Sequence, residues 1–377
     1  MKIAIAKEKL SAEKRVAATP ETVKKLIALG AQVSVVSGAV VAAAVTDEAY
    51  RAAGAQVGSE DEVYKDADVI FRVRHPGADE VAKMKKGAVM IGILSPYQEK
   101  DLLKVYAAQG IAAMAMELVP RITRAQNMDV LSSQANLAGY RAVLETAYEF
   151  GHGFPLMMTA AGTVPAAKVF IMGAGVAGLQ AIATARRLGA QVSATDVRAA
   201  SKEQVQSLGA SFVMVENEET KAAETSGGYA KEMSEDYKKQ QAQLIADTIK
   251  KQDIVITTAL IPGKKAPVLV TEDMVKSMKT GSVILDMAVE QGGNCVLSKP
   301  GEVVEVNGVK IIGHLNLPSR IAADASALYA RNLLNFLTPL VDKETKALKI
   351  NFDDEIVKAT TLTRDGAIVH PNFAQGA

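Results

Sequence analysis

The sequence predicts an α/β protein with two doubly wound, parallel-sheet domains that are joined by long helices. A chain of 377 residues is longer than one ordinary hydrophobic core accommodates, so two domains are expected. Short apolar segments alternate with helical segments in two separate runs, which is the pattern of parallel sheets with crossover helices. A glycine-rich turn directly follows the apolar segment that opens the second run.

The first run occupies about the first 120 residues, and the C-terminal segment is expected to return to it. The first helix begins at Thr19-Pro20, because threonine caps a helix and proline suits its first position. Long helices are expected over 136–150 and 326–337. We therefore expect a first α/β domain made of residues 1–130 and 325–377. Its strands are expected over 2–6, 32–36, 68–73, 88–91 and 111–114.

The second run begins with the pattern Gly173-x-Gly175-x-x-Gly178 after an apolar strand. The first glycine permits a tight turn, the second lets the backbone approach a pyrophosphate, and the third lets the helix pack close to the strand. The helix begins near Val176, and its N-terminus offers unpaired N–H groups and a positive dipole end to phosphates. The order of strand, turn and helix predicts a Rossmann-like dinucleotide-binding domain over residues 131–324.

An acidic residue ends the second strand of this domain. Asp196 lies about 20 residues after the glycines, where a carboxylate accepts hydrogen bonds from the adenosine ribose. Its negative charge repels a 2′-phosphate and favours NAD(H) over NADP(H). Arg198 and Lys202 follow closely and leave NADP(H) open as an alternative. Val197 and Arg198 are expected to contact the cofactor beside this acid.

Two later segments are also candidates for cofactor binding. Ala259 and Leu260 follow the strand over 253–257, at the sheet edge where ligands bind in such domains. Gly228 and Tyr229 lie in a long charged segment, and loops of that length are usually functional lids or disordered. Tyr229 closes over the adenosine half of the cofactor in one interpretation and is a solvated loop tip in the other.

A dense group of polar residues precedes the first long helix and contains Arg121, Gln126, Asp129 and Ser132. Arg121 and Asp129 can hold each other and a nicotinamide carboxamide. Gln126 offers both a donor and an acceptor to such an amide, and Ser132 can complete the set. The alternative is an ion pair that caps a helix start. The residues alone leave both interpretations open.

Composition excludes several classes of protein. A net charge of +1 without a run of lysine and arginine gives no nucleic-acid surface. Cys295 is the only cysteine and the four histidines lack metal-ligand spacing, so neither a disulfide nor a metal site is expected. No apolar stretch reaches the roughly 18–20 residues that span a bilayer. A reducing cytoplasm is the expected location.

Segments along essentially the whole chain resemble the NAD(H)-binding component (domain I, from the alpha subunit) of proton-translocating NAD(P)+ transhydrogenase. These segments are Lys7-Glu8 with Arg15-Val16-Ala17, Met116-Glu117-Leu118 with Pro120-Arg121-Ile122, 125–134, 136–141, 158–163, 227–233 and 257–263.

The resemblance implies that this chain binds NADH and passes hydride directly to NADP+ on a partner component. A separate membrane component couples this transfer to proton translocation. The resemblance further implies a homodimer in the cytoplasm, associated peripherally with the inner membrane through partner subunits. It places Asp196 on the ribose and the loop with Gly228 and Tyr229 over the nucleotide. The residues that it places beside the nicotinamide are Arg121, Gln126, Asp129 and Ser132.

Alanine dehydrogenase, a relative with the same two-domain plan, shares some of these segments, among them Arg15 and Gln291-Gly292-Gly293. An amino-acid dehydrogenase binds a carboxylate and moves protons as well as hydride, so it needs a lysine, a histidine and an acid. At the matching positions this chain has Arg72, Ser95 and Glu290. A self-contained amino-acid dehydrogenase is therefore the second hypothesis, and a non-catalytic NAD-binding sensor is the third.

Overall fold

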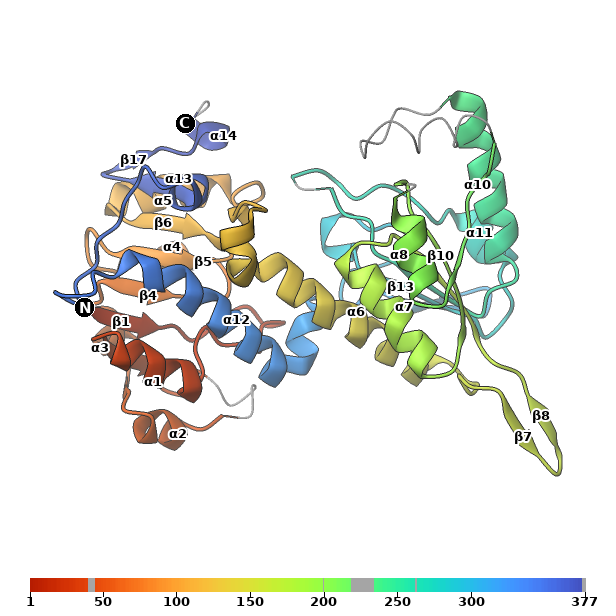
Figure 1. The fold of residues 1–377 in the computed structure, drawn as a ribbon, viewed down its shortest axis with the longest axis horizontal. Coiled ribbons are helices and arrows are strands. Elements are labelled where there is room, and N and C mark those ends of the chain that lie inside the picture. The colour runs from red at the N-terminus through yellow and green to blue at the C-terminus, as the bar shows by residue number, and fades with distance from the viewer. Residues whose placement is uncertain (40–44, 199, 218–233, 262, 375–377) are drawn as a thin grey trace. The chain divides into compact units, whose positions relative to one another are not determined.

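The computed structural model describes residues 1–39, 45–198, 200–217, 234–261 and 263–374, which fall into two compact units (Figure 1). The first unit comprises Met1–Gln134 and Pro318–Ala377, and the second comprises Ala135–Leu317. Each unit contains one large, mostly parallel sheet with helices packed on both faces. The expected fold class is therefore confirmed.

The first unit has an eight-stranded sheet in the order β17-β16-β6-β5-β4-β1-β2-β3. The six strands from β3 to β6 are parallel and follow the doubly wound order 3-2-1-4-5-6. The two C-terminal strands extend the sheet in antiparallel fashion beyond β6, which the sequence did not predict. The strands are β1 (Lys2–Ile5), β2 (Gln32–Val36), β3 (Gln56–Gly58), β4 (Val69–Phe71), β5 (Val89–Gly92), β6 (Ala112–Ala115), β16 (Thr361–Arg364) and β17 (Ala367–Ile368).

Alternate side chains of these strands point to opposite faces and form two cores. Ile3 and Ile5 of β1 pack with one set of helices, whereas Ala4 packs on the opposite face. The first face is covered by α1 (Pro20–Ala28), α2 (Asp47–Ala52), α12 (Ala322–Leu337) and α13 (Glu355–Thr360). The second face is covered by α3 (Glu60–Tyr64), α4 (Ala78–Val81), α5 (Lys100–Gln109) and α14 (Pro371–Ala374). Short 3-10 helices are η2 (Met116–Leu118), η3 (Thr123–Met128), η5 (Leu317–Ile321) and η6 (Thr338–Leu340).

The second unit has a seven-stranded sheet in the order β11-β10-β9-β12-β13-β15-β14. Its parallel strands repeat the order 3-2-1-4-5-6, and β14 is an antiparallel edge strand that the sequence did not predict. The central strand β9 pairs with β10 and β12, so three strand ends meet beside the glycine turn. The strands are β9 (Lys168–Met172), β10 (Gln191–Thr195), β11 (Ser211–Phe212), β12 (Ile254–Thr257), β13 (Val283–Asp286), β14 (Val303–Val306) and β15 (Val309–Ile312).

Both faces of this second sheet are buried under helices. Val169 and Ile171 of β9 pack with α6 (Val130–Glu149), α7 (Val176–Arg187) and α8 (Ser201–Ser207). Phe170 and Met172 face α10 (Glu235–Ile249) and α11 (Glu272–Ser277). The 3-10 helix η4 (Val289–Gln291) follows β13. Helix α6 starts six residues before the predicted 136, because the polar group that precedes it contributes its first turn.

Residues 157–163, which the sequence predicts to be a loop, form a two-stranded antiparallel hairpin instead. It consists of β7 (Met157–Thr159) and β8 (Gly162–Val164), and it projects from the second unit (Figure 1). The Thr159 hydroxyl donates to Gly162 O at 3.0 Å and accepts from Ala161 N–H at 3.1 Å, and Gly162 has a φ of 135° that suits the turn. The apolar side chains of this hairpin are exposed, with Met158 at 82%.

Candidate functional site

The turn after β9 has the shape that a dinucleotide pyrophosphate needs. Gly173 has a φ of 107°, which favours glycine. A Cβ at Gly178 would overlap the carbonyl oxygen of Gly173, so only glycine lets α7 approach the strand this closely. A Cβ at Gly175 would meet no atom within 4 Å, so this backbone faces open space at the N-terminus of α7. These observations fit a bound phosphate at this position.

A further glycine that the sequence patterns did not single out for this role supports the same helix end. A Cβ at Gly139 of α6 would overlap the carbonyl oxygen of Ala177, so α6 packs directly against the first turn of α7. The spacing between Gly139 and the fingerprint gave no signal of this contact, because it depends on how two distant helices cross.

Asp196 ends β10 beside the glycine turn, and its carboxylate is held by hydrogen bonds. It accepts from the N–H of Ala174 at 2.7 Å and from the N–H of Arg198 at 2.8 Å. The Arg198 guanidinium adds bonds of 2.9 and 3.1 Å. Burial would raise the pKa of Asp196, but the bonds from Arg198 and Ala174 outweigh it and hold the pKa below its usual value. The carboxylate is therefore charged and aligned at neutral pH.

The two cations that left NADP(H) open are both paired with carboxylates. Arg198 is bonded to Asp196 as described, and Lys202 Nζ lies 2.7 Å from the carboxylate of Glu216. A 2′-phosphate would therefore meet an acid in front of each cation.

Apolar side chains surround the turn at the C-terminal edge of the sheet and remain exposed. Val197 is 90% exposed, and Val176, Leu260 and Ile261 are between 40 and 47% exposed. Three of these were predicted cofactor contacts, and Ile261 was not. Isolated exposed apolar residues are common, but four that follow β9, β10 and β12 at one sheet edge fit the apolar lining of a nucleotide site.

The segment after β12 lies against the glycine turn. The Thr258 hydroxyl donates to the carbonyl oxygen of Gly173 at 3.1 Å, and its N–H donates to Met172 O at 2.9 Å. Ala259 follows directly, so this predicted contact is placed beside the turn. Gly228 and Tyr229, the predicted lid, lie outside the described residues.

The loop after β13 is held by one buried carboxylate. Asp286 accepts hydrogen bonds from Ala288 N–H at 2.9 Å, Cys295 N–H at 2.9 Å and the Ser298 hydroxyl at 2.6 Å. The Cys295 side chain packs in the apolar core beneath.

We expect the Cys295 thiol to be unreactive in the folded protein. Burial raises its pKa to about 11, so almost no thiolate forms near neutral pH. Reaction with Ellman's reagent at about pH 8 should be at least about 100-fold slower than that of a free thiol. The same assay in denaturant is the control and should show one fast-reacting thiol. Fast labelling of the folded protein would mean that the loop after β13 opens readily.

The predicted nicotinamide residues lie on η3 and the start of α6 in the first unit. Asp129 Oδ1 accepts from Ser132 N–H at 2.9 Å, and Oδ2 accepts from the Ser132 hydroxyl at 2.5 Å. Asp129 therefore caps α6. Arg121 and Gln126 are exposed, and in the described parts of the chain neither side chain has a hydrogen bond or ion pair. The predicted ion pair between Arg121 and Asp129 is thus wrong, because Ser132 occupies both carboxylate oxygens.

The two arginines at positions that matter for a dehydrogenase are buried and bound to acids of the chain itself. Glu13 contacts Arg15 Nε at 2.8 Å and Nη2 at 2.6 Å. Arg72 Nη1 donates to Glu80 at 2.7 Å, and Nη2 lies 3.7 Å from Glu8. Burial raises the pKa of Glu8 in spite of the neighbouring guanidinium. Neither arginine is left unpaired for a substrate carboxylate.

The other two departures from the dehydrogenase pattern also have structural partners. Ser95 has a φ of 51°, and its N–H donates to Glu117 at 2.5 Å. Burial raises the pKa of Glu117. Glu290 is exposed and accepts from Asn316 N–H at 3.3 Å.

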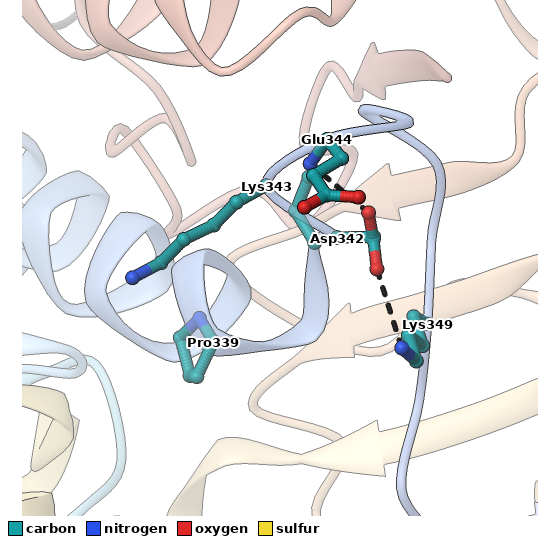
Figure 2. A pocket seen from close by; sticks show the side chains of 6 residues that line it. Pro339, Asp342, Lys343, Glu344 and Lys349 are labelled. Carbon is teal, nitrogen blue, oxygen red and sulfur yellow. Dashed lines mark hydrogen bonds and ion pairs between the residues drawn. The ribbon is translucent and has the colours of Figure 1, made fainter.

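An open hollow in the first unit lies between η6 and the segment that follows it, apart from these groups (Figure 2). There Asp342 accepts from Glu344 N–H at 3.0 Å and from Lys349 Nζ at 3.3 Å, and no predicted site residue lines it. Within the described residues, no cluster of three or more His, Cys, Asp or Glu could hold a metal ion. The helices described here are too short or too polar to cross a membrane.

Comparisons with known proteins match the whole chain. The model of the alanine dehydrogenase/PNT C-terminal domain matches residues 142–371, and that of the N-terminal domain matches residues 4–138. The chain is 59% identical over 384 residues to an NAD(P) transhydrogenase alpha subunit of Rhodospirillum rubrum, with 100% of both chains covered. A transhydrogenase crystal structure from Sinorhizobium meliloti has a TM-score of 0.91 and 55% identity, covering 98% of this chain and 100% of that one.

A more distant relative is alanine dehydrogenase 1 of Staphylococcus aureus (strain bovine RF122 / ET3-1), which is 29% identical over 353 residues, with 91% of this chain and 88% of the relative covered. Identity to the transhydrogenase subunit is thus about twice as high, as the sequence segments predicted. The chain belongs to the alanine dehydrogenase/PNT family, within its group of NAD(P) transhydrogenase alpha subunits.

Proposed function

We propose that this chain binds NADH and passes its hydride directly to NADP+ held on a partner component of a proton-translocating transhydrogenase. The observation that best supports this is the glycine turn with Asp196, at the C-terminal edge of a doubly wound sheet. The high identity to a transhydrogenase alpha subunit supports the reaction.

The second unit has the groups that NADH needs. The open backbone at Gly175 and the N-terminus of α7 bind the pyrophosphate, and Asp196 accepts hydrogen bonds from the ribose hydroxyls. Val197 and Leu260 supply apolar surface for the bases. The carboxylates on Arg198 and Lys202 oppose a 2′-phosphate, so NAD(H) is the cofactor and NADP(H) binds to the partner.

Hydride transfer between two nicotinamides needs no side-chain acid or base. It requires the two reacting carbons to be aligned and water to be excluded. We assign Arg121, Gln126, Asp129 and Ser132 to the nicotinamide carboxamide. The unpaired side chains of Arg121 and Gln126 supply donors and an acceptor, while Asp129 and Ser132 are already fixed to each other.

The function requires partners that this chain does not provide. One holds NADP(H), and another forms the membrane component that couples hydride transfer to proton translocation. We propose that the chain works in the cytoplasm, attached to the inner membrane through these subunits.

Rapid-mixing absorbance tests the proposed reaction. NADH is mixed with an NADP+ analogue of shifted spectrum, with and without a purified NADP(H)-binding component. Fast transfer only in the presence of that component supports the proposal. A parallel sample contains NADH, pyruvate and ammonium. Turnover there would support the amino-acid dehydrogenase, which the ion pairs of Arg15 and Arg72 argue against. Tight NADH binding without transfer to any acceptor would support a sensor.

We also propose that the chain forms a homodimer to which the β7–β8 hairpin contributes. Leu156, Met157 and Met158 are exposed by 60, 41 and 82%, and exposed apolar groups on a projecting hairpin mark a protein contact. Met158→Lys is expected to raise the dimer dissociation constant by about 30-fold or more, measured by analytical ultracentrifugation.

Val303→Lys is the matched control, because Val303 is also a half-exposed apolar strand residue of the second unit. Equal dissociation constants for wild type and Met158→Lys, or equal weakening by both variants, would contradict a role of the hairpin.

A further inference from the structure

One buried asparagine binds both ends of the segment that follows β12. The side chain of Asn294 is fully buried. Its Nδ2 donates to the carbonyl oxygens of Ala259 at 2.9 Å and Pro267 at 2.8 Å, and its Oδ1 accepts from Ala259 N–H at 3.1 Å. Both N–H groups of the carboxamide are thereby used, and its oxygen is used as well.

The main chain around Asn294 strengthens the same connection. The N–H groups of Leu269 and Val270 donate to Asn294 O at 2.8 and 3.0 Å, and Ala266 N–H donates to Gln291 O at 2.8 Å. The Gln291-Gly-Gly-Asn294 segment therefore anchors the β12 segment through side-chain and main-chain bonds.

The two glycines of this anchor are required by its geometry. Gly292 and Gly293 have φ values of 94° and 76°. A Cβ at Gly293 would lie 2.8 Å from a carboxylate oxygen of Asp286, which itself accepts from Cys295 N–H. Asn294 is thus placed between two fixed neighbours.

The anchored segment lies beside the glycine turn. Thr258 is bonded to Met172 and Gly173, and a Cβ at Gly173 would lie 3.6 Å from Ala259 N. The N–H of Ala259 is already donated to Asn294. This segment can therefore contact a ligand only through other atoms, chiefly the half-exposed Leu260 side chain.

We propose that Asn294 is a positioning residue for the nucleotide site, which holds Ala259 and Leu260 beside the Gly173 turn in the conformation that contacts the dinucleotide. This inference rests on the proposed binding of NADH. Asn294 does not touch the ligand and acts through Ala259.

Asn294→Asp tests the role with almost no change in shape. The substitution puts a carboxylate oxygen opposite two carbonyl oxygens, so the bonds to Ala259 O and Pro267 O are lost and the segment shifts. NADH affinity, measured by calorimetric titration, is expected to fall about tenfold. Affinity for 5′-AMP should change less than about twofold, because Asp196 and the α7 N-terminus hold that fragment.

Asn307→Asp is the matched control. Its Nδ2 donates to Lys276 O at 3.1 Å at the turn between β14 and β15, away from the strand ends that bind the nucleotide. It should leave the affinity for both ligands unchanged. An unreactive Cys295 thiol in Asn294→Asp would confirm that the neighbouring core is intact.

The outcomes separate this inference from the proposed function. Wild-type binding of NADH with equal affinity in Asn294→Asp would overturn the inference alone, as would equal weakening of NADH and 5′-AMP. Failure of the wild type to bind NADH would overturn both. If Asn294→Asp does not fold, amide hydrogen exchange of the wild type decides. Slow exchange of the Ala259 amide supports the inference, and unprotected exchange contradicts it.

Discussion

Replacing Asp129 with asparagine is expected to slow hydride transfer by about 100-fold, because loss of alignment at the reacting carbons has an effect of this size. NADH affinity should fall less than about threefold, since the nucleotide is bound chiefly through its phosphates and ribose. Rapid-mixing absorbance measures the rate, and calorimetric titration measures the affinity.

Asparagine is the informative substitution because Asp129 also caps α6. An asparagine caps a helix about as well as an aspartate, and it can keep both bonds to Ser132 by accepting from the N–H and donating to the hydroxyl. The unfolding midpoint should therefore stay almost unchanged. Any loss of rate then reports on the carboxylate charge rather than on the helix.

Asp354→Asn is the matched control, because Asp354 caps α13 in the same unit by accepting from Ile356 and Val357 N–H. It should leave hydride transfer unchanged. An equal loss of transfer rate and NADH affinity in Asp129→Asn would contradict the positioning role. A normal rate in Asp129→Asn would leave Asp129 as a helix cap only.

The sequence predicted the second sheet well because each of its signals is local. Gly173, Gly178 and Asp196 act on neighbouring backbone, and their turn has the expected form. The hairpin at Met157–Val164 was predicted as a loop because its apolar residues resemble a strand approach, and the turn depends on bonds of Thr159.

The contacts that the sequence could not predict join residues far apart in the chain. Gly139 meets Ala177 because of the angle at which α6 crosses α7. Arg121 and Asp129 are close in sequence and opposite in charge, but the N-terminal turn of α6 offers Asp129 a nearer donor in Ser132. Spacing alone does not decide between two such partners, because the cap geometry depends on where the helix begins.

Asp196→Ala is expected to weaken NADH binding by about 30-fold, because a buried carboxylate that accepts from ribose hydroxyls contributes about 2 kcal/mol. Calorimetric titration measures this change. The hydrogen bonds from Arg198 and Ala174 keep the pKa of Asp196 below its usual value despite burial. Its charge is therefore present from neutral pH down through about pH 5, and NADH affinity should be constant over that range.

The same substitution should raise affinity for NADPH, since Arg198 loses the carboxylate that holds it. Its guanidinium then becomes available to a 2′-phosphate. The double variant Asp196→Ala/Arg198→Ala should retain the loss of NADH affinity and lose the gain for NADPH. An unchanged dissociation constant for NADH in Asp196→Ala would exclude the ribose role. A gain for NADPH that persists without Arg198 would mean that Asp196 acts on nucleotide choice only by repelling the phosphate, and that Arg198 has no part in it.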